Sequence, residues 1–192
     1  SSYSTAWSTL AALNIQDKKL DVAISQSKKA IEADRTNSIA YYNLAYALEE
    51  KGELDKAIKR YSEAVNIDSS FTRAYSALGN LYINLHRPQD ALDVLERAVR
   101  ITPESEYIYL IYKNLGKAYF ALNEYDAAIR FLEHSRQFQH VDVPETIYFL
   151  AKAYEAAGMT KESIAKWQRY IEIESDTLKQ QEAVNRLQQL RN

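Results

Sequence analysis

The sequence predicts an all-α protein, built as a solenoid of stacked antiparallel helix pairs, and two observations lead to this prediction. First, the 192 residues include only 4 Gly and 3 Pro, which is too few for a chain rich in β-turns. Second, similar short stretches recur at a nearly constant spacing, which is typical of stacked structural repeats. A single helix pair cannot bury its apolar face alone, so neighbouring pairs should stack around one continuous core.

Three columns of mostly small residues recur along the chain with the same spacing. The columns are Ala11, Ala45, Gly79, Gly116 and Ala151; then Ala23, Ala57, Ala91, Ala128 and Ser163; then Ala30, Ala64, Ala98, Ser135 and Tyr170. Each column advances in steps of 34, 34, 37 and 35 residues. Small side chains let helix backbones approach closely, so we expect these columns at helix contacts. The spacing predicts a single array with repeats at about 4–37, 38–71, 72–105, 109–142 and 144–177.

Each repeat reads as two helices. In residues 38–52, Tyr41, Leu44 and Leu48 follow the i, i+3, i+7 spacing of one helix face. Gly52 should end this helix, because Gly tolerates the left-handed conformation found after helix C-termini. Residues 53–68 form the second helix, with Leu54, Ala57, Ile58, Tyr61, Ala64 and Val65 on one face.

Other helix ends carry similar signals. Gly158 and Asn123 are expected to end first helices as Gly52 does. Pro88 suits a first helical turn, and Pro103 follows the end of a second helix. The last stretch, at about 177–191, is mostly polar but has Ala183, Leu187 and Leu190 on one face, with Asp176 as N-cap. We expect it to be a capping helix that covers the last repeat.

The pattern resembles the tetratricopeptide repeat, which has W-x2-L-G-x2-Y, then A-x3-F, then A and P, over 34 residues. The third repeat matches best, with Tyr75, Leu78, Gly79, Tyr82, Ala91, Leu95, Ala98 and Pro103. The first repeat has Asn14 where Tyr is usual, and the fifth deviates most, with Ser163, Trp167 and Tyr170. The resemblance covers roughly residues 4–177. It implies a right-handed superhelix whose first helices line a concave groove that binds an extended or helical peptide.

No catalytic constellation is visible. His86, His134 and His140 lack the spacing of a metal pair and are expected at the surface. Gly79 and Gly116 are isolated within helices, so they form no phosphate-binding loop. With no Cys in the chain, disulfides and thiolate metal sites are excluded. The sequence predicts a protein that is not an enzyme and needs no cofactor or metal.

Charge and hydropathy restrict the partners. The net charge of −2 argues against a nucleic-acid footprint, which is normally basic. No apolar run approaches the roughly 20 residues of a membrane span. The chain begins SSYSTAW and its single Met is Met159, so we expect the native start to lie upstream. We expect a cytoplasmic location, with a periplasmic or membrane-tethered one left open.

The groove residues follow from the repeat frame that the resemblance supplies. Asn side chains can pair with the N–H and C=O of an extended backbone, and Tyr offers apolar area with a polar tip. Lys and Arg favour a carboxylate-bearing partner. The predicted peptide-binding residues are Tyr42, Asn43, Tyr46, Arg73, Asn80, Lys113, Asn114, Lys117, Tyr148 and Lys152. We therefore expect a protein or peptide partner with acidic and aromatic or apolar side chains.

Three other interpretations are weighed. Co-chaperones of the family hold a C-terminal peptide in a carboxylate clamp, but Ser8, Ala12 and Ala77 stand where that clamp needs Lys, Asn and Arg. Self-assembly through convex or terminal faces, for example around Trp7, is the first alternative function. RNA binding by helical repeats is the second, and the net charge disfavours it.

Overall fold

The computed structural model describes residues 1–139 and 141–191, and all regular secondary structure within these residues is α-helical, which confirms the predicted fold class. The helices of the described residues are α1 (Ser2–Gln16), α2 (Leu20–Ala33), α3 (Ser38–Glu50), α4 (Leu54–Ile67), α5 (Thr72–Asn84), α6 (Pro88–Ile101), α7 (Ile108–Ala121), α8 (Tyr125–Phe138), α9 (Pro144–Ala156), α10 (Thr160–Ile173) and α11 (Thr177–Arg191).

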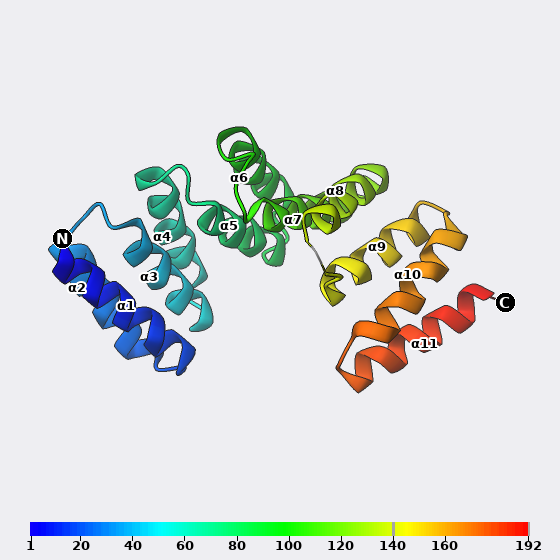
Figure 1. The fold of residues 1–192 in the computed structure, drawn as a ribbon, viewed down its shortest axis with the longest axis horizontal. Helices are drawn as coiled ribbons and strands as arrows, with labels where there is room; N and C mark the ends of the chain where they lie inside the picture. The colour runs from blue at the N-terminus through cyan, green and yellow to red at the C-terminus, as the bar shows by residue number, and fades with distance from the viewer. Residues whose placement is uncertain (140, 192) are drawn as a thin grey trace.

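The helices stack as pairs into an arch, with the two termini at opposite ends (Figure 1). Helices α3, α5, α7 and α9 lie along the inner side of the arch, and α4, α6 and α8 lie along its outer side (Figure 1). Each inner helix also packs against the inner helix of a neighbouring pair, as α5 does against α7. The inner helices therefore follow the concave side of the arch (Figure 1).

The three columns of small residues are buried throughout, as expected. Gly79 shows why the first column must be small. A Cβ added at Gly79 would lie 2.6 Å from Cδ2 of Leu95 on the paired helix, far inside normal contact distance. The same clash would occur between Gly116 and Leu132. The small residues that recur once per repeat therefore mark the closest contact between the two helices of each pair.

The turn inside each pair contains one residue with positive φ. Gly52 (φ 77°), Gly158 (φ 76°) and Asn123 (φ 62°) take this role, as the sequence predicts. In the first and third repeats the same conformation falls on Lys18 (φ 59°) and His86 (φ 57°). These two side chains carry a Cβ that disfavours the left-handed region, so their turns are strained.

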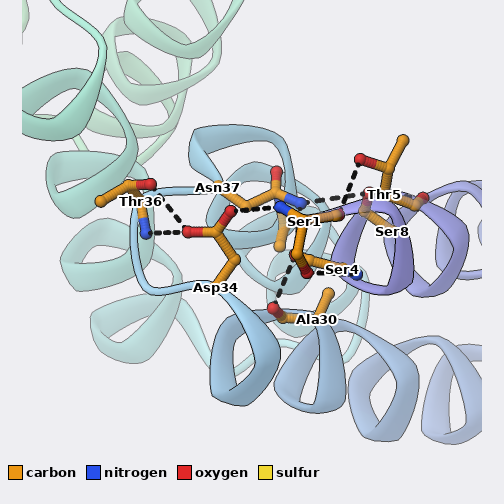
Figure 2. A network of polar contacts seen from close by, with 9 residues as sticks. Ser1, Ser4, Thr5, Ser8, Ala30, Asp34, Thr36 and Asn37 are labelled. Atoms are coloured by element: carbon orange, nitrogen blue, oxygen red, sulfur yellow. Dashed lines mark hydrogen bonds and ion pairs between the residues drawn. The ribbon is translucent and has the colours of Figure 1, made fainter.

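A network of hydrogen bonds connects the first helix pair to the second (Figure 2). The Asn37 side chain accepts from the backbone N–H of Ala40 at 3.1 Å, which caps α3, and donates to the Ser4 hydroxyl at 2.8 Å. Ser4 donates in turn to the carbonyl oxygen of Ala30 at 2.7 Å. One partly buried network therefore joins α1, α2 and the start of α3.

Helix α11 closes the C-terminal end of the array. Asp176 caps it by accepting from the backbone N–H of Leu178 at 2.9 Å, as predicted. Ala183 and Leu187 on α11 belong to the same buried cluster as Trp167. The last helix pair is thus covered by a helix whose other face is polar.

Candidate functional site

A hollow of about 280 Å³ lies on the concave face, between α3, α5, α7 and the start of α9. We call it the central hollow. It brings together six of the ten predicted groove residues: Tyr42, Tyr46, Arg73, Asn80, Lys113 and Asn114. Glu49, Tyr61, Ser76, Ala77, Leu110 and Glu145 complete its lining. Asn43, Lys117, Tyr148 and Lys152 lie outside the central hollow.

The amide groups of Asn43 and Asn114 are used inside the protein, which corrects the expectation that they are free to pair with a guest backbone. Asn43 Nδ2 donates to the backbone oxygen of Ser8 at 2.8 Å, and Asn114 Nδ2 donates to that of Ser76 at 2.9 Å. The two asparagines are only 5% and 2% exposed. Each bond joins an inner helix to the preceding inner helix, so these residues hold repeats together.

Two predicted cations are neutralised by the chain itself. Glu145, at the start of α9, receives hydrogen bonds from the ammonium groups of Lys113 and Lys117, each at 2.6 Å. Burial raises the pKa of Glu145, but the two ammonium groups outweigh burial and lower it to about 2. Lys117 Nζ also donates to Asn80 Oδ1 at 2.8 Å. These lysines are therefore not free cations awaiting a guest carboxylate.

Arg73 is the cation of the central hollow that remains available. It is exposed on α5, and its guanidinium lies 5.2 Å from the Tyr107 ring centroid and 5.8 Å from that of Phe71. Arg73 takes part in none of the ion pairs found within residues 1–139 and 141–191. The two rings hold the guanidinium in place without using its hydrogen-bond donors.

The tyrosines supply the apolar part of the hollow. Tyr42 is half-buried and packs against the rings of Tyr61 and Phe71, with centroids 5.6 and 5.2 Å away. Tyr46, one helical turn further along α3, is exposed. Tyr61 donates its hydroxyl to Glu49 at 2.8 Å, and burial raises the pKa of Glu49 despite this bond. The hollow therefore has an aromatic floor, with Arg73 at its edge.

A second hollow, of about 560 Å³, lies between α9, α10 and α11, and we call it the C-terminal pocket. Its aromatic walls are Tyr148, Phe149, Trp167 and Tyr170, and its charged residues are Glu145, Glu174, Glu182 and Lys179. Of the predicted groove residues only Tyr148 lines it. Lys152 lies beside it, with Nζ 5.3 Å from the Tyr148 ring centroid.

Sequence reasoning missed most of this pocket. Trp167 and Tyr170 lie at repeat positions, where the repeat pattern predicts packing residues of the most deviant repeat. Glu174 precedes the capping helix, and Glu182 lies within it. The sequence does contain an indication of this pocket: Trp167 and Tyr170 are larger than the residues at the same positions in most other repeats.

No group of three or more His, Asp or Glu in the described residues could hold a metal ion. None of the helices described here is both long and apolar enough to span a bilayer. His86 and His134 are exposed, as predicted, and His140 lies outside the described residues.

Family models support the resemblance drawn from the sequence. Models described as tetratricopeptide repeat match residues 70–139 and 27–59, and one described as TPR repeat matches residues 47–85. Together they extend over residues 27–139, which is more than half of the chain. One relative, the small glutamine-rich tetratricopeptide repeat-containing protein 2 of Mycosarcoma maydis, is 32% identical over 91 residues. That match covers 47% of this chain and 26% of the relative, so the chain spans about a quarter of its length.

Solved structures share the fold at lower sequence identity. The structure of pilF from Pseudomonas aeruginosa matches with a TM-score of 0.87 and 18% identity, over 98% of this chain and 84% of that one. YrrB, described as a TPR protein with an unusual peptide-binding site, matches with a TM-score of 0.69 and 19% identity, over 93% of this chain and 90% of that one.

Proposed function

Because the chain belongs to the tetratricopeptide repeat family, we propose that it is a non-catalytic scaffold whose concave face binds an extended segment of another protein. Members of this family are generally protein–protein interaction scaffolds. YrrB, which has the same fold, is described as having a peptide-binding site. The partner and its pathway are not fixed by these similarities, so the proposal rests on the side chains of the central hollow.

The observation that carries the proposal is the state of Arg73. Lys113 and Lys117 share Glu145, whereas the Arg73 guanidinium is exposed, held by rings and free of an ion pair within the described residues. A guanidinium presents donors in a fixed fork that matches a carboxylate. The guest is therefore expected to place an Asp, a Glu or a C-terminal carboxylate beside Arg73.

The remainder of the hollow favours an apolar neighbour for that carboxylate. Tyr42 and Tyr46 lie on α3, across the hollow from Arg73 on α5. Tyrosine binds through its ring area and through its hydroxyl, and it is common in binding surfaces. A volume of about 280 Å³ suits one or two side chains, not a whole helix, which supports an extended guest.

Selection from a displayed random peptide library tests this proposal even though the natural partner is unidentified. We expect the selected peptides to share an acidic residue next to an aromatic or large apolar one. The change Arg73→Glu should abolish their binding, because it puts a carboxylate against a carboxylate.

Arg97→Glu is the matched control. Arg97 is also exposed and lies over a ring, that of Tyr75, but on outer helix α6. Its reversal should leave binding unchanged, with circular dichroism showing both variants folded. The proposal fails if no peptide family is enriched, or if both reversals weaken binding equally.

A second candidate function, self-association, is favoured by the apolar surface of the first helix pair. Tyr3, Leu10 and Leu13 on α1 and Val22 on α2 are exposed, with Tyr3 packed edge-on against Trp7. Exposed apolar side chains gathered on one face commonly mark an interface. Sedimentation at several concentrations should then show dimers that Leu13→Lys converts to monomers. A monomer at all concentrations would rule this candidate out.

A further inference from the structure

The C-terminal pocket has a chemistry opposite to that of the central hollow. Two of its carboxylates, Glu174 and Glu182, come from α10–α11, and its only cation is Lys179. Its third carboxylate, Glu145, is already occupied by Lys113 and Lys117. A guest entering this pocket therefore meets aromatic walls and, among the lining residues outside the Glu145 ion pairs, two carboxylates against one ammonium group.

The aromatic walls of the pocket pack directly against one another. Tyr148 lies 5.6 Å from Trp167 with the rings at 84°, and 5.5 Å from Tyr170. Trp167 and Tyr170 are themselves nearly perpendicular, at 86°. The face of an aromatic ring attracts an ammonium or a guanidinium group, so a guest cation in this pocket would lie over a ring face.

The chain already uses rings of this region to hold its own ammonium groups. Lys117 Nζ lies 5.4 Å from the centroid of Phe149, and Lys152 Nζ lies 5.3 Å from that of Tyr148. Attraction between cations and these rings is thus an observed property of the protein. Because these two lysines already lie over Phe149 and Tyr148, a guest cation is left with Trp167, Tyr170 and the two carboxylates of the pocket other than Glu145.

Glu174 is held as a fixed, ionised carboxylate at the edge of the pocket. Its Oε1 accepts from the backbone N–H groups of Ser175 and Asp176 at 2.9 and 3.0 Å. Its Oε2 accepts from the Tyr170 hydroxyl at 2.8 Å. The backbone N–H of Asp176 and the Tyr170 hydroxyl lower the pKa of Glu174. Its oxygens retain capacity for a further donor.

We propose that the C-terminal pocket binds a lysine or arginine side chain of the guest segment. The inference rests on the proposed function, because the pocket is continuous with the groove. Glu145 lines both the central hollow and the C-terminal pocket, so the two adjoin. A segment on the concave face therefore places an acidic residue at Arg73 and a basic residue in the C-terminal pocket, which fixes its direction.

The test uses a probe that carries only the cation. Capped acetyl-Gly-Arg-Gly-amide is titrated into the full chain and followed by nuclear magnetic resonance at the indole N–H of Trp167. The chain has only two Trp, so Trp7→Phe assigns this signal. We expect a saturable shift with the arginine peptide. The same peptide with neutral citrulline, which has nearly the same shape, should bind at least fivefold more weakly.

Two variants locate the effect. Glu174→Gln should weaken the arginine peptide about fivefold to tenfold, because it removes the fixed charge and keeps the shape. Glu172→Gln is the matched control: it removes a charge two residues earlier, on α10, but Glu172 pairs with Arg169 and does not line the pocket. If Glu174→Gln unfolds, the binding of the arginine peptide is measured with Glu182→Gln in its place.

Equal binding of the arginine and citrulline peptides, or equal weakening by Glu172→Gln and Glu174→Gln, would overturn the inference. A saturable shift at other residues with none at Trp167 would do the same. The probe has no carboxylate, so its failure leaves the proposed function standing. That function is judged separately, by the library selection and Arg73→Glu.

Discussion

Junctions between neighbouring inner helices are of two kinds, and the difference separates structural from guest-facing residues. Between α1 and α3, and between α5 and α7, an asparagine amide donates to a backbone oxygen of the preceding helix. We call these the amide-bonded junctions. Between α3 and α5, and between α7 and α9, the matching position holds Ala77 and Phe149. We call these the amide-free junctions.

At the amide-free junctions, side chains other than an asparagine amide fill the space between the helices. At the α3–α5 junction, Tyr42 packs on aromatic rings and Arg73 is exposed. At the α7–α9 junction, Lys113 and Lys117 meet Glu145. In a repeat protein each junction between neighbouring repeats contributes separately to stability. Some junctions can therefore be strongly stabilised while others contain the residues that bind a guest.

The largest expected effect is on an amide-bonded junction. Asn114→Ala should lower the free energy of unfolding by about 2 kcal/mol, because it removes the buried hydrogen bonds from α7 to the carbonyl and hydroxyl oxygens of Ser76 on α5. Urea unfolding measures this. Asn66→Ala, on an exposed position of α4, is the control and should change stability by less than about 0.5 kcal/mol. Similar losses for both variants would show that the amide bond does not stabilise the junction.

A smaller effect is expected from Glu145→Gln at an amide-free junction. It leaves two ammonium groups facing a neutral amide, and we expect a loss of about 1–2 kcal/mol at neutral pH. Folding lowers the pKa of Glu145 from 4.5 to about 2, because the ammonium groups of Lys113 and Lys117 outweigh the effect of burial. Its contribution is therefore complete above pH 4.5 and disappears as the pH falls towards 2.

The same urea unfolding, repeated between pH 6 and pH 2.5, checks the sign. The difference between the parent protein and Glu145→Gln should shrink steadily below pH 4.5. Glu104→Gln, which alters an exposed carboxylate in the α6–α7 connection, should show no such convergence. A constant gap across this pH range would contradict the ion-pair account.

The turns inside the helix pairs provide a stability effect that is independent of the junctions, because they lie away from both kinds of junction. His86→Gly should stabilise the protein by about 0.5–1 kcal/mol, since Gly adopts positive φ without strain. Gly52→Ala should destabilise by a similar amount, although no atom lies within 4 Å of the added Cβ. Thermal unfolding measures both. If the two changes had the same sign, backbone conformation would not be the cause.

The smallest expected effect comes from converting one kind of junction into the other. Ala77→Asn places an amide on α5 where Asn43 and Asn114 lie on their helices. We expect a gain of about 0.5 kcal/mol if it bonds to the backbone of α3, measured by urea unfolding. Because Ala77 lines the central hollow, the same change should weaken selected peptides. Tighter peptide binding would contradict the division between the two junctions.

The fold could be predicted in detail because its signals are local and repeated. Gly79 and Gly116 mark the closest helix contacts, and Gly52 and Gly158 mark turns that need positive φ. The positive φ of Lys18 and His86 escaped prediction, because these residues carry no such preference. There the surrounding helices impose the conformation, which local sequence does not reveal.

The site could be predicted only in outline. The repeat frame placed Asn43, Asn114 and Lys117 on the inner helices, but an inward position does not distinguish a guest contact from a neighbour contact. That distinction depends on residues one repeat away, such as Ser76 for Asn114 and Glu145 for Lys117. Such contacts between residues of different repeats depend on how neighbouring helices pack, which the sequence alone does not give.

Lys117 gives the arch a property that neither hollow has alone. Its side chain is 8% exposed and joins Asn80 on α5 to Glu145 on α9, across the helix between them. It lines neither hollow. Because Lys117 ties α5, α7 and α9 together, we expect it to restrain the movement of these helices relative to one another. The spacing that a guest needs between its acidic and its basic side chain would then depend on a lysine that lies outside both binding surfaces.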